Sequence, residues 1–377
     1  MGPFPQLDPI PIPAPVWLMK VLSLLTLALH FSAVMILVGT LVLVLWLNVA
    51  GRSRKDENQV SAAYTLAKRM PVIMTWVINL GVPPLLFAQV LYSPAIYSSS
   101  VLIGVLWISV IPLLMLAYWM LYKTVGAFEG GKSPTLPALI ALLVVLGIGQ
   151  IYAMNMSLML RPEAWAEMYA ASPLGVRGPK GDPTMTPRWL FVMAGGPVFG
   201  GLWALLLSNM AYLSDGARQA LRRAGGWAAF IGAVLQVGLG SAVLQAQPAA
   251  VREAVAANGL YSVSGYLFLA TVALAGLLGV FQALRGVSGL ALGIAGLLSG
   301  FLSTAGSVIV RDGIRDVTLK AKGFDVWNRT EASNWSVVIV FLLLFVVMLG
   351  VVYWLLGVMR QATPPNEQVS LLSLIHI

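Results

Sequence analysis

The sequence contains no cysteine and only two histidines, at positions 30 and 376 of 377 residues. The absence of cysteine excludes disulfides, thiolate metal sites, iron–sulfur clusters and covalently attached c-type haem within this chain. Charged residues form only 10% of the chain, whereas soluble globular proteins carry roughly a quarter. Because 59% of the residues are hydrophobic, the composition predicts an integral membrane protein.

The formal net charge of +9 does not indicate a nucleic-acid partner. Membrane proteins concentrate Lys and Arg in loops that face the cytoplasm and anionic lipid, so we expect membrane lipid as a partner and no nucleic acid. The first 15 residues, MGPFPQLDPIPIPAP, lack the basic segment of a signal peptide. Their prolines predict an extended lead-in outside the membrane.

Long apolar runs divide the rest of the chain into candidate transmembrane helices, each of which needs about 20 residues. Nine runs qualify: 16–49, 71–95, 99–125, 135–159, 187–213, 226–247, 259–284, 287–310 and 333–358. Runs of this length are too long for barrel strands. We therefore predict an all-α polytopic membrane protein, with about nine transmembrane helices bundled over 16–358 and a cytoplasmic tail at 359–371.

Basic residues in short loops predict the orientation of the bundle. They occur in the first, third and fifth loops: Arg52, Arg54, Lys55, Lys68, Arg69, Lys123, Lys132, Arg218, Arg222 and Arg223. These loops should face the cytoplasm, which places the N-terminus outside. The longer loops at 160–186 and 311–332 carry basic residues mixed with acids and weigh less in this rule.

No Asp or Glu lies in the interior of a predicted span. Proton relays and cation pumps normally use buried carboxylates, so this absence argues against a proton-coupled transporter and a self-contained oxygen-reducing site. Polar side chains within the spans include His30, Asn79, Gln89, Gln150, Asn155, Gln236 and Gln245. We expect Asn79, Gln236 and Gln245 to form hydrogen bonds between helices. The pair Pro83-Pro84 predicts a break near the middle of the second span.

His30 lies about fourteen residues into the first span, which is roughly 21 Å of helix, and therefore well inside the hydrocarbon. An intramembrane ionisable residue is a functional candidate, and neutral imidazole is a usual axial ligand of haem iron. A neutral histidine bonded to a neighbouring helix is an equally good interpretation. Without a second membrane histidine, a haem here has one histidine ligand, alone or completed by a methionine such as Met154, Met156, Met159 or Met193.

Three stretches resemble subunit I of the bd-type quinol oxidases, and in particular shortened relatives from anaerobic and metal-respiring bacteria. They are LTLALHFSAVMILVGTLVLVLWL, VINLGVPPLLFAQVLY, and LMLRPEAWAEMYAASPLG together with PTMTPRWLFVMAGGPVFGGLW. The resemblance covers about the first 215 residues. It implies nine spans with the N-terminus outside, in the bacterial inner membrane. His30 matches the family's ligand of a high-spin b-type haem.

The chain departs from this family at three places. Gln89 stands where the family has a glutamate near the haems, and Phe191 stands where a relative has the histidine ligand of a second b-type haem. The long quinol-binding loop between spans six and seven is reduced to 248–258. The resemblance therefore implies at most one haem b, with His30 as iron ligand and Gln89, Met154 and Met193 as further candidate cofactor-binding residues. It does not imply a complete oxygen-reducing oxidase.

These observations favour a membrane electron-transfer subunit of a respiratory complex. A quinone is a second candidate cofactor, and the expected partners are a c-type cytochrome or other subunits of such a complex. A cofactor-free membrane anchor or scaffold is the alternative interpretation. A transporter would suit a broken helix, but the odd span count, the lack of repeats and the lack of buried carboxylates oppose it.

The last six residues, LSLIHI, match the translation of a common sequencing adapter. On this interpretation residues 372–377, with His376, are not part of the natural protein, and the true C-terminus is missing. His30 is then the one histidine on which a functional argument can rest.

Overall fold

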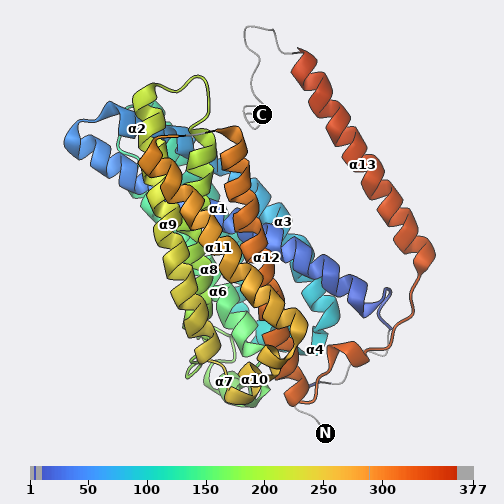
Figure 1. Ribbon diagram of the computed structural model, residues 1–377. Helices are drawn as coiled ribbons and strands as arrows, with labels where there is room; N and C mark the ends of the chain where they lie inside the picture. The colour runs from blue at the N-terminus through green and yellow to red at the C-terminus, as the bar shows by residue number, and fades with distance from the viewer. Residues whose placement is uncertain (1–3, 6–10, 288, 363–377) are drawn as a thin grey trace.

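The computed structural model describes residues 4–5, 11–287 and 289–362, and these residues form an α-helical bundle (Figure 1). In this part of the chain, eight segments are long and apolar enough to cross a membrane. They are α1 (Val16–Arg54), α2 with α3 (Glu57–Ala67 and Met70–Leu91), α5 (Gly104–Glu129), α6 (Thr135–Leu158), α8 (Met185–Leu207), α9 (Asp215–Gln245), α11 (Gly259–Arg285) and α12 (Leu290–Ala321). The predicted all-α membrane fold is confirmed.

Shorter helices complete the ends of the bundle. They are α4 (Ser93–Leu102), α7 (Trp165–Ala171), α10 (Ala249–Ala257) and the 3-10 turns η1 (Pro162–Ala164) and η2 (Val326–Asn328). The proline-rich lead-in is extended where it is described, because Ile12 forms a parallel bridge with Glu331. The loops predicted at 160–186 and 248–258 thus contain helices.

The ninth predicted span corresponds to α13 (Trp335–Ala362), which stands apart from the other helices (Figure 1). The side chains described along its first part, from Trp335 to Leu344, are mostly exposed and apolar. Residues 363–377, which include most of the predicted tail, the proposed adapter residues and His376, lie outside the described residues.

The helix α1 lies at the centre of the bundle and packs against α3, α6, α8 and α12. Its closest approach is to the glycine-rich part of α8, where a methyl group at Gly39 would overlap the carbonyl of Gly196 and the backbone at Gly200. Small residues let membrane helices approach this closely. The helix has 39 residues, about 58 Å of length, so it extends beyond a hydrocarbon core of about 30 Å.

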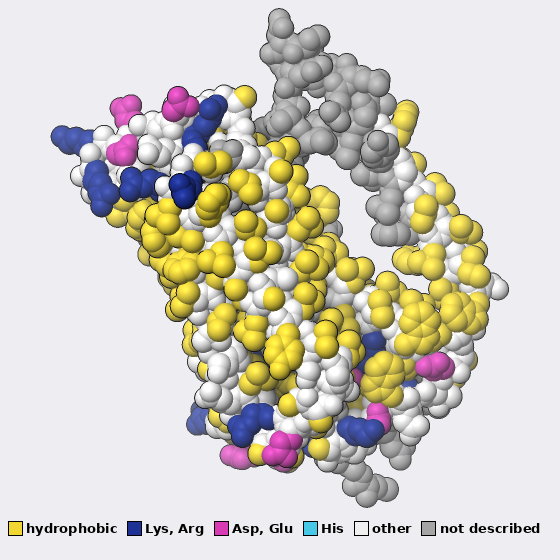
Figure 2. Space-filling model, viewed as in Figure 1, with side chains coloured by type: hydrophobic (Ala, Val, Ile, Leu, Met, Phe, Trp, Pro, Cys, Tyr) yellow, Lys and Arg dark blue, Asp and Glu magenta, His cyan; other side chains and the backbone are white. Residues whose placement is uncertain are grey.

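The first, third and fifth loops meet at one end of the bundle, as predicted. Arg52 donates a hydrogen bond to the Lys132 carbonyl at 2.7 Å, and Ser214 donates one to Asn58 at 3.1 Å. Lys and Arg side chains gather at this end, above a wide apolar band (Figure 2). We call it the basic end, and the end with the lead-in, α4, α7 and α10 the N-terminal end. That the basic end faces the cytoplasm stays a prediction.

Two predicted helix boundaries differ from the structure. The pair Pro83-Pro84 does not break the second span, because α3 continues through both prolines and the chain turns at Tyr92. This removes a feature that had favoured a transporter. The span predicted to end at 310 continues to Ala321 and carries Asp312 and Asp316 into the bundle. The expectation that spans contain no carboxylate was therefore wrong at this end.

The amides expected to join helices bond mainly within their own helix. Asn79 donates to the Thr75 carbonyl at 2.8 Å, and Gln245 donates to Ser241 at 3.0 Å. The buried Oε1 atom of Gln236 has no hydrogen-bond partner among the described residues. A carbonyl or hydroxyl one turn earlier is the nearest available acceptor for such a side chain.

Asn155 is the exception, because it joins α6 to α4. Its Nδ2 atom donates to the Ser100 hydroxyl at 2.9 Å, and the Ser99 hydroxyl donates to its Oδ1 atom. All three side chains come from helices near the N-terminal end, where α4 packs against α6.

Candidate functional site

His30 lies where α1 packs against α3. Its Nδ1 atom is 3.0 Å from the Val77 carbonyl oxygen. Gly81, one turn further along α3, leaves room for the ring, since a methyl group there would lie 2.8 Å from its Cε1 atom. The ring of Phe31 is 6.0 Å away, centroid to centroid. The site is therefore formed by adjacent residues of α1 and one face of α3.

The hydrogen bond to Val77 fixes the tautomer of His30. A carbonyl oxygen can only accept, so Nδ1 must carry the proton. The neutral ring then has a lone pair on Nε2, and the hydrogen bond of Nδ1 is the one that His30 forms among the described residues. Metal-binding histidines are commonly oriented in this way, by a hydrogen bond from the other ring nitrogen to a carbonyl or carboxylate.

The other predicted site residues lie on three helices. Gln89 is on α3, eight residues beyond Gly81 and thus about 12 Å further along the helix. Met154 of α6 packs toward Gly178, and Met193 of α8 packs toward Gly149 of α6. In the described residues, no hydrogen bond joins His30 to any of the three. Phe191, at the position of the expected second histidine, packs against Phe268 with ring centroids 5.5 Å apart.

A buried charge cluster, which the sequence analysis missed, lies toward the N-terminal end from His30. The ammonium of Lys20 on α1 is 2.6 Å from a carboxylate oxygen of Asp312 and 2.6 Å from one of Asp316, both on α12. It also donates to the Tyr92 hydroxyl at 2.6 Å, and that hydroxyl donates to Asp316 at 2.7 Å. Trp327 completes the cluster by donating to Asp316 at 3.2 Å.

Arginines extend this cluster toward His30. Arg315 lies 3.7 Å from an oxygen of Asp312, and its guanidinium stacks 4.7 Å above the Tyr92 ring. Arg311 lies one turn earlier on α12, with its guanidinium 5.9 Å from the ring of Phe31. Within the described residues, Arg311 forms no hydrogen bond or salt bridge. An arginine without a carboxylate partner inside a membrane bundle is an unusual and costly arrangement.

Two signals in the sequence could have revealed this cluster. Lys20 falls inside the first predicted span, and an ionisable residue there requires a partner. The spacing of Asp312 and Asp316 places both carboxylates on one face of a helix. They were assigned to a loop because the charged segment that contains them ends the apolar run.

Two salt bridges lie on the outside of the N-terminal end. Lys322 is 2.6 Å from Glu163, and Lys320 is 2.9 Å from Asp325. Partial burial would raise the pKa of Glu163, but the hydrogen bond from Lys322 and the positive charges nearby lower that pKa below its usual value. The hydrogen bond from Lys320 likewise lowers the pKa of Asp325.

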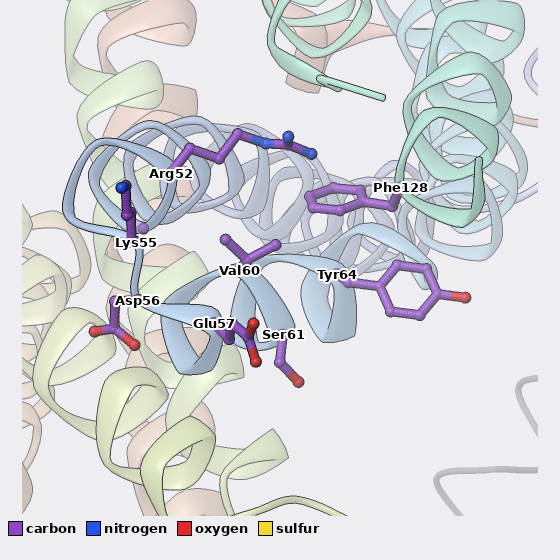
Figure 3. A pocket seen from close by; sticks show the side chains of 9 residues that line it. Arg52, Lys55, Asp56, Glu57, Val60, Ser61, Tyr64 and Phe128 are labelled. Atoms are coloured by element: carbon purple, nitrogen blue, oxygen red, sulfur yellow. The ribbon is translucent and has the colours of Figure 1, made fainter. Parts of the chain in front are cut away.

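A polar cleft of about 430 Å³ lies at the basic end, far from His30 along α1. Figure 3 shows that it is lined by the end of α1, the first turns of α2 and Phe128 of α5. Its charges serve the local structure: Asp56 caps α2 by accepting hydrogen bonds from two backbone N–H groups, and Arg52 is bonded to Asn48 at 2.9 Å. Because these charges are used in local hydrogen bonds, we assign no ligand to this cleft.

No protein-family model and no curated protein matches this sequence. Among solved structures, a chain in the structure of bd oxidase from Geobacillus thermodenitrificans has a similar fold, with a TM-score of 0.64. The two chains are 13% identical, and the match covers 94% of this chain and 100% of the other. The chain has a bd-oxidase-like fold. An identity this low supports the fold and leaves the activity open.

The bd-oxidase-like fold agrees with the resemblance inferred from the sequence around His30. The similarity of fold covers nearly the whole chain.

Proposed function

We propose that this chain is an electron-transfer subunit of a membrane respiratory complex, and that His30 is the axial ligand of a single b-type haem. The observation that carries this proposal is the hydrogen bond from Nδ1 of His30 to the Val77 carbonyl. It leaves the Nε2 lone pair directed away from that bond and without a hydrogen-bond partner in the described residues. A haem would supply one-electron transfer.

The residues around His30 suit such a group. Gly81 and Val77 hold the imidazole in one orientation, which a ligand atom needs. Arg311, close to Phe31 and without a salt bridge among the described residues, would supply positive charge for an anionic cofactor edge. Met154 and Met193 are the candidate sixth ligands. Along the chain, Gln89 of α3 lies between Val77, which accepts the hydrogen bond of His30, and Tyr92 of the Lys20 cluster, and its amide would be the group that binds a quinone.

The test is the spectrum of the purified full-length protein, expressed with haem supplied. We expect a reduced-minus-oxidised difference spectrum with b-type haem bands, and a haem content of at most one per chain. His30→Ala should lose these bands, whereas Met115→Ala, at an exposed position of α5 that is not a candidate ligand, should keep them. A wild-type protein without a Soret band would refute the haem proposal.

A cofactor-free scaffold in a respiratory complex is the second candidate. Its support is that the Val77 carbonyl already satisfies one nitrogen of His30, and that Phe191 fills with an aromatic contact the place of the second histidine. On this proposal, His30→Ala leaves both the spectrum and the assembly with partner subunits unchanged. Co-purification of tagged wild-type and variant chains from the native membrane distinguishes the two candidates.

A further inference from the structure

A groove opens at the basic end between the first turns of α9 and the last turn of α11. Its volume is about 610 Å³. The side chains that define it are Arg222, Arg223 and Trp227 of α9 with Leu284 and Arg285 of α11. We call it the arginine groove. It lies on a different part of the molecule from His30 and the proposed haem.

The arginine groove carries positive charge that the protein does not neutralise. Its one carboxylate, Asp215, lies 3.3 Å from Arg218, which is outside the groove. In the described part of the chain, Arg222, Arg223 and Arg285 have no carboxylate within salt-bridge distance. Three guanidinium groups therefore line one groove, and among the described residues no carboxylate forms a salt bridge with them.

The three arginines differ in how they are held. Arg222 donates to the carbonyl of Gly286 and, through Nε, to the carbonyl of Arg218 at 3.4 Å. It therefore spans the groove from α9 to the end of α11. Arg223 and Arg285 form no hydrogen bond or salt bridge among the described residues, so their five N–H donors each are available to a ligand. Arginine is well suited to bind phosphate, because two parallel N–H groups match two phosphate oxygens.

An apolar surface begins directly beside these arginines. On α9, Trp227 is followed at helical spacing by Ile231 and Val234, which are 52% and 59% exposed. On α11, exposed side chains continue from Leu284 through Phe281 to Leu277. The two helices touch below the groove, where a methyl group at Gly226 would overlap Gly279. Two apolar strips thus run side by side from the arginines toward the middle of the bundle.

We propose that the arginine groove binds the phosphate headgroup of an anionic phospholipid, with its acyl chains along the exposed faces of α9 and α11. Soluble phosphate could contact the arginines in the same way, but it has no apolar part that would contact the exposed faces of α9 and α11. The basic end is also the end predicted to face the cytoplasmic leaflet, where basic pockets between helices bind anionic headgroups. Trp227 is placed as an interfacial anchor, at the level where the polar and apolar parts meet.

The test is native mass spectrometry of the purified full-length protein in mild detergent, titrated with phosphatidylglycerol or phosphatidylcholine. We expect the wild type to bind phosphatidylglycerol preferentially. The double variant Arg223→Gln/Arg285→Gln should bind it about tenfold or more weakly, since each basic residue near a membrane contributes on the order of 1 kcal/mol. Both side chains are exposed, so the variant should elute from size exclusion as the wild type does.

The matched control is Arg54→Gln, because Arg54 is an exposed arginine of the basic end that lies outside the groove. It should bind phosphatidylglycerol as the wild type does. Equal binding by the double variant and the wild type, or an equal loss in Arg54→Gln, would overturn the proposal. Displacement of the lipid by millimolar inorganic phosphate or by deacylated glycerophosphoglycerol would also overturn it, since the site would then recognise a soluble phosphate.

Discussion

Replacing Lys20 by methionine should destabilise the protein strongly, because it leaves two buried carboxylates without their shared cation. The side chain of Lys20 is 4% exposed, and those of Asp312 and Asp316 are 11% and 10% exposed. Removing one partner of a buried ion pair costs about 3–5 kcal/mol. Arg315 still lies 3.7 Å from Asp312, and the Tyr92 hydroxyl still faces Asp316, so we expect the lower value, about 3 kcal/mol.

The control for this prediction is Lys322→Met. The distance from Lys322 to Glu163 is also 2.6 Å, but these side chains are 28% and 57% exposed. An exposed pair contributes about 0–1 kcal/mol. The two variants share the substitution and a 2.6 Å ion pair, and they differ in burial and in the number of partners, since Lys20 also contacts a second carboxylate and the Tyr92 hydroxyl. A comparable effect in both would refute the argument that burial determines the cost.

The assay is the temperature at which half of the monomer peak is lost from size exclusion after heating in detergent, with one heating schedule for all variants because membrane proteins often unfold irreversibly. For a chain of this size, about 3 kcal/mol corresponds to a shift of roughly 3–6 °C. The double variant Lys20→Met/Asp316→Asn should recover more than half of this shift, since Asp312 keeps Arg315. No recovery would mean that lost packing, and not the unpaired charge, causes the effect.

Two further predictions concern His30 and the outside of the N-terminal end. Gly81→Ala should displace the imidazole of His30 and reduce haem binding by the purified protein, whereas Gly147→Ala should not, because a methyl group at Gly147 meets nothing within 4 Å. If the wild type binds haem, equal haem spectra of the two variants would contradict the placement of the haem on His30. Because the folded state lowers the pKa of Glu163, its salt bridge with Lys322 should persist at neutral pH and be lost as the pH falls through that lowered pKa. Pepsin cleavage near the bridge should therefore increase on acidification in the wild type and change less in Glu163→Gln, and identical pH profiles would contradict the assignment.

The membrane spans could be predicted from the sequence because each requires a long apolar run, and this requirement holds whatever the helices pack against. Because successive spans cross the membrane in opposite directions, the first, third and fifth loops must lie at one end, and this is the basic end. The position of His30 along the first helix also follows from the sequence, since helix rise converts residue number into distance, whereas its depth in the membrane stays a prediction.

The charge cluster was not accessible in the same way. The last turns of α12, which carry Asp312 and Asp316, have the composition of a loop, and their burial depends on the pairing with Lys20. That pairing is set by tertiary packing between the first and the last helices of the main bundle. The prediction that Asn79 and Gln245 join helices was wrong because each side chain finds an acceptor one turn earlier in its own helix. No neighbouring helix is needed to satisfy them.

The separation of Lys20 from its carboxylates along the chain also has a consequence for biosynthesis. Asp312 follows Lys20 by 292 residues, so at a synthesis rate of about 5–20 residues per second it emerges roughly 15–60 s later. During that interval the first helix has a lysine near its membrane entry and no counter-charge from α12. The Val16 N–H likewise lacks its partner until Glu331, which accepts its hydrogen bond at 2.8 Å, has been synthesised. The N-terminal end of α1 can therefore reach its final packing only after Glu331 has been synthesised, and until then the nascent chain is open to membrane quality control.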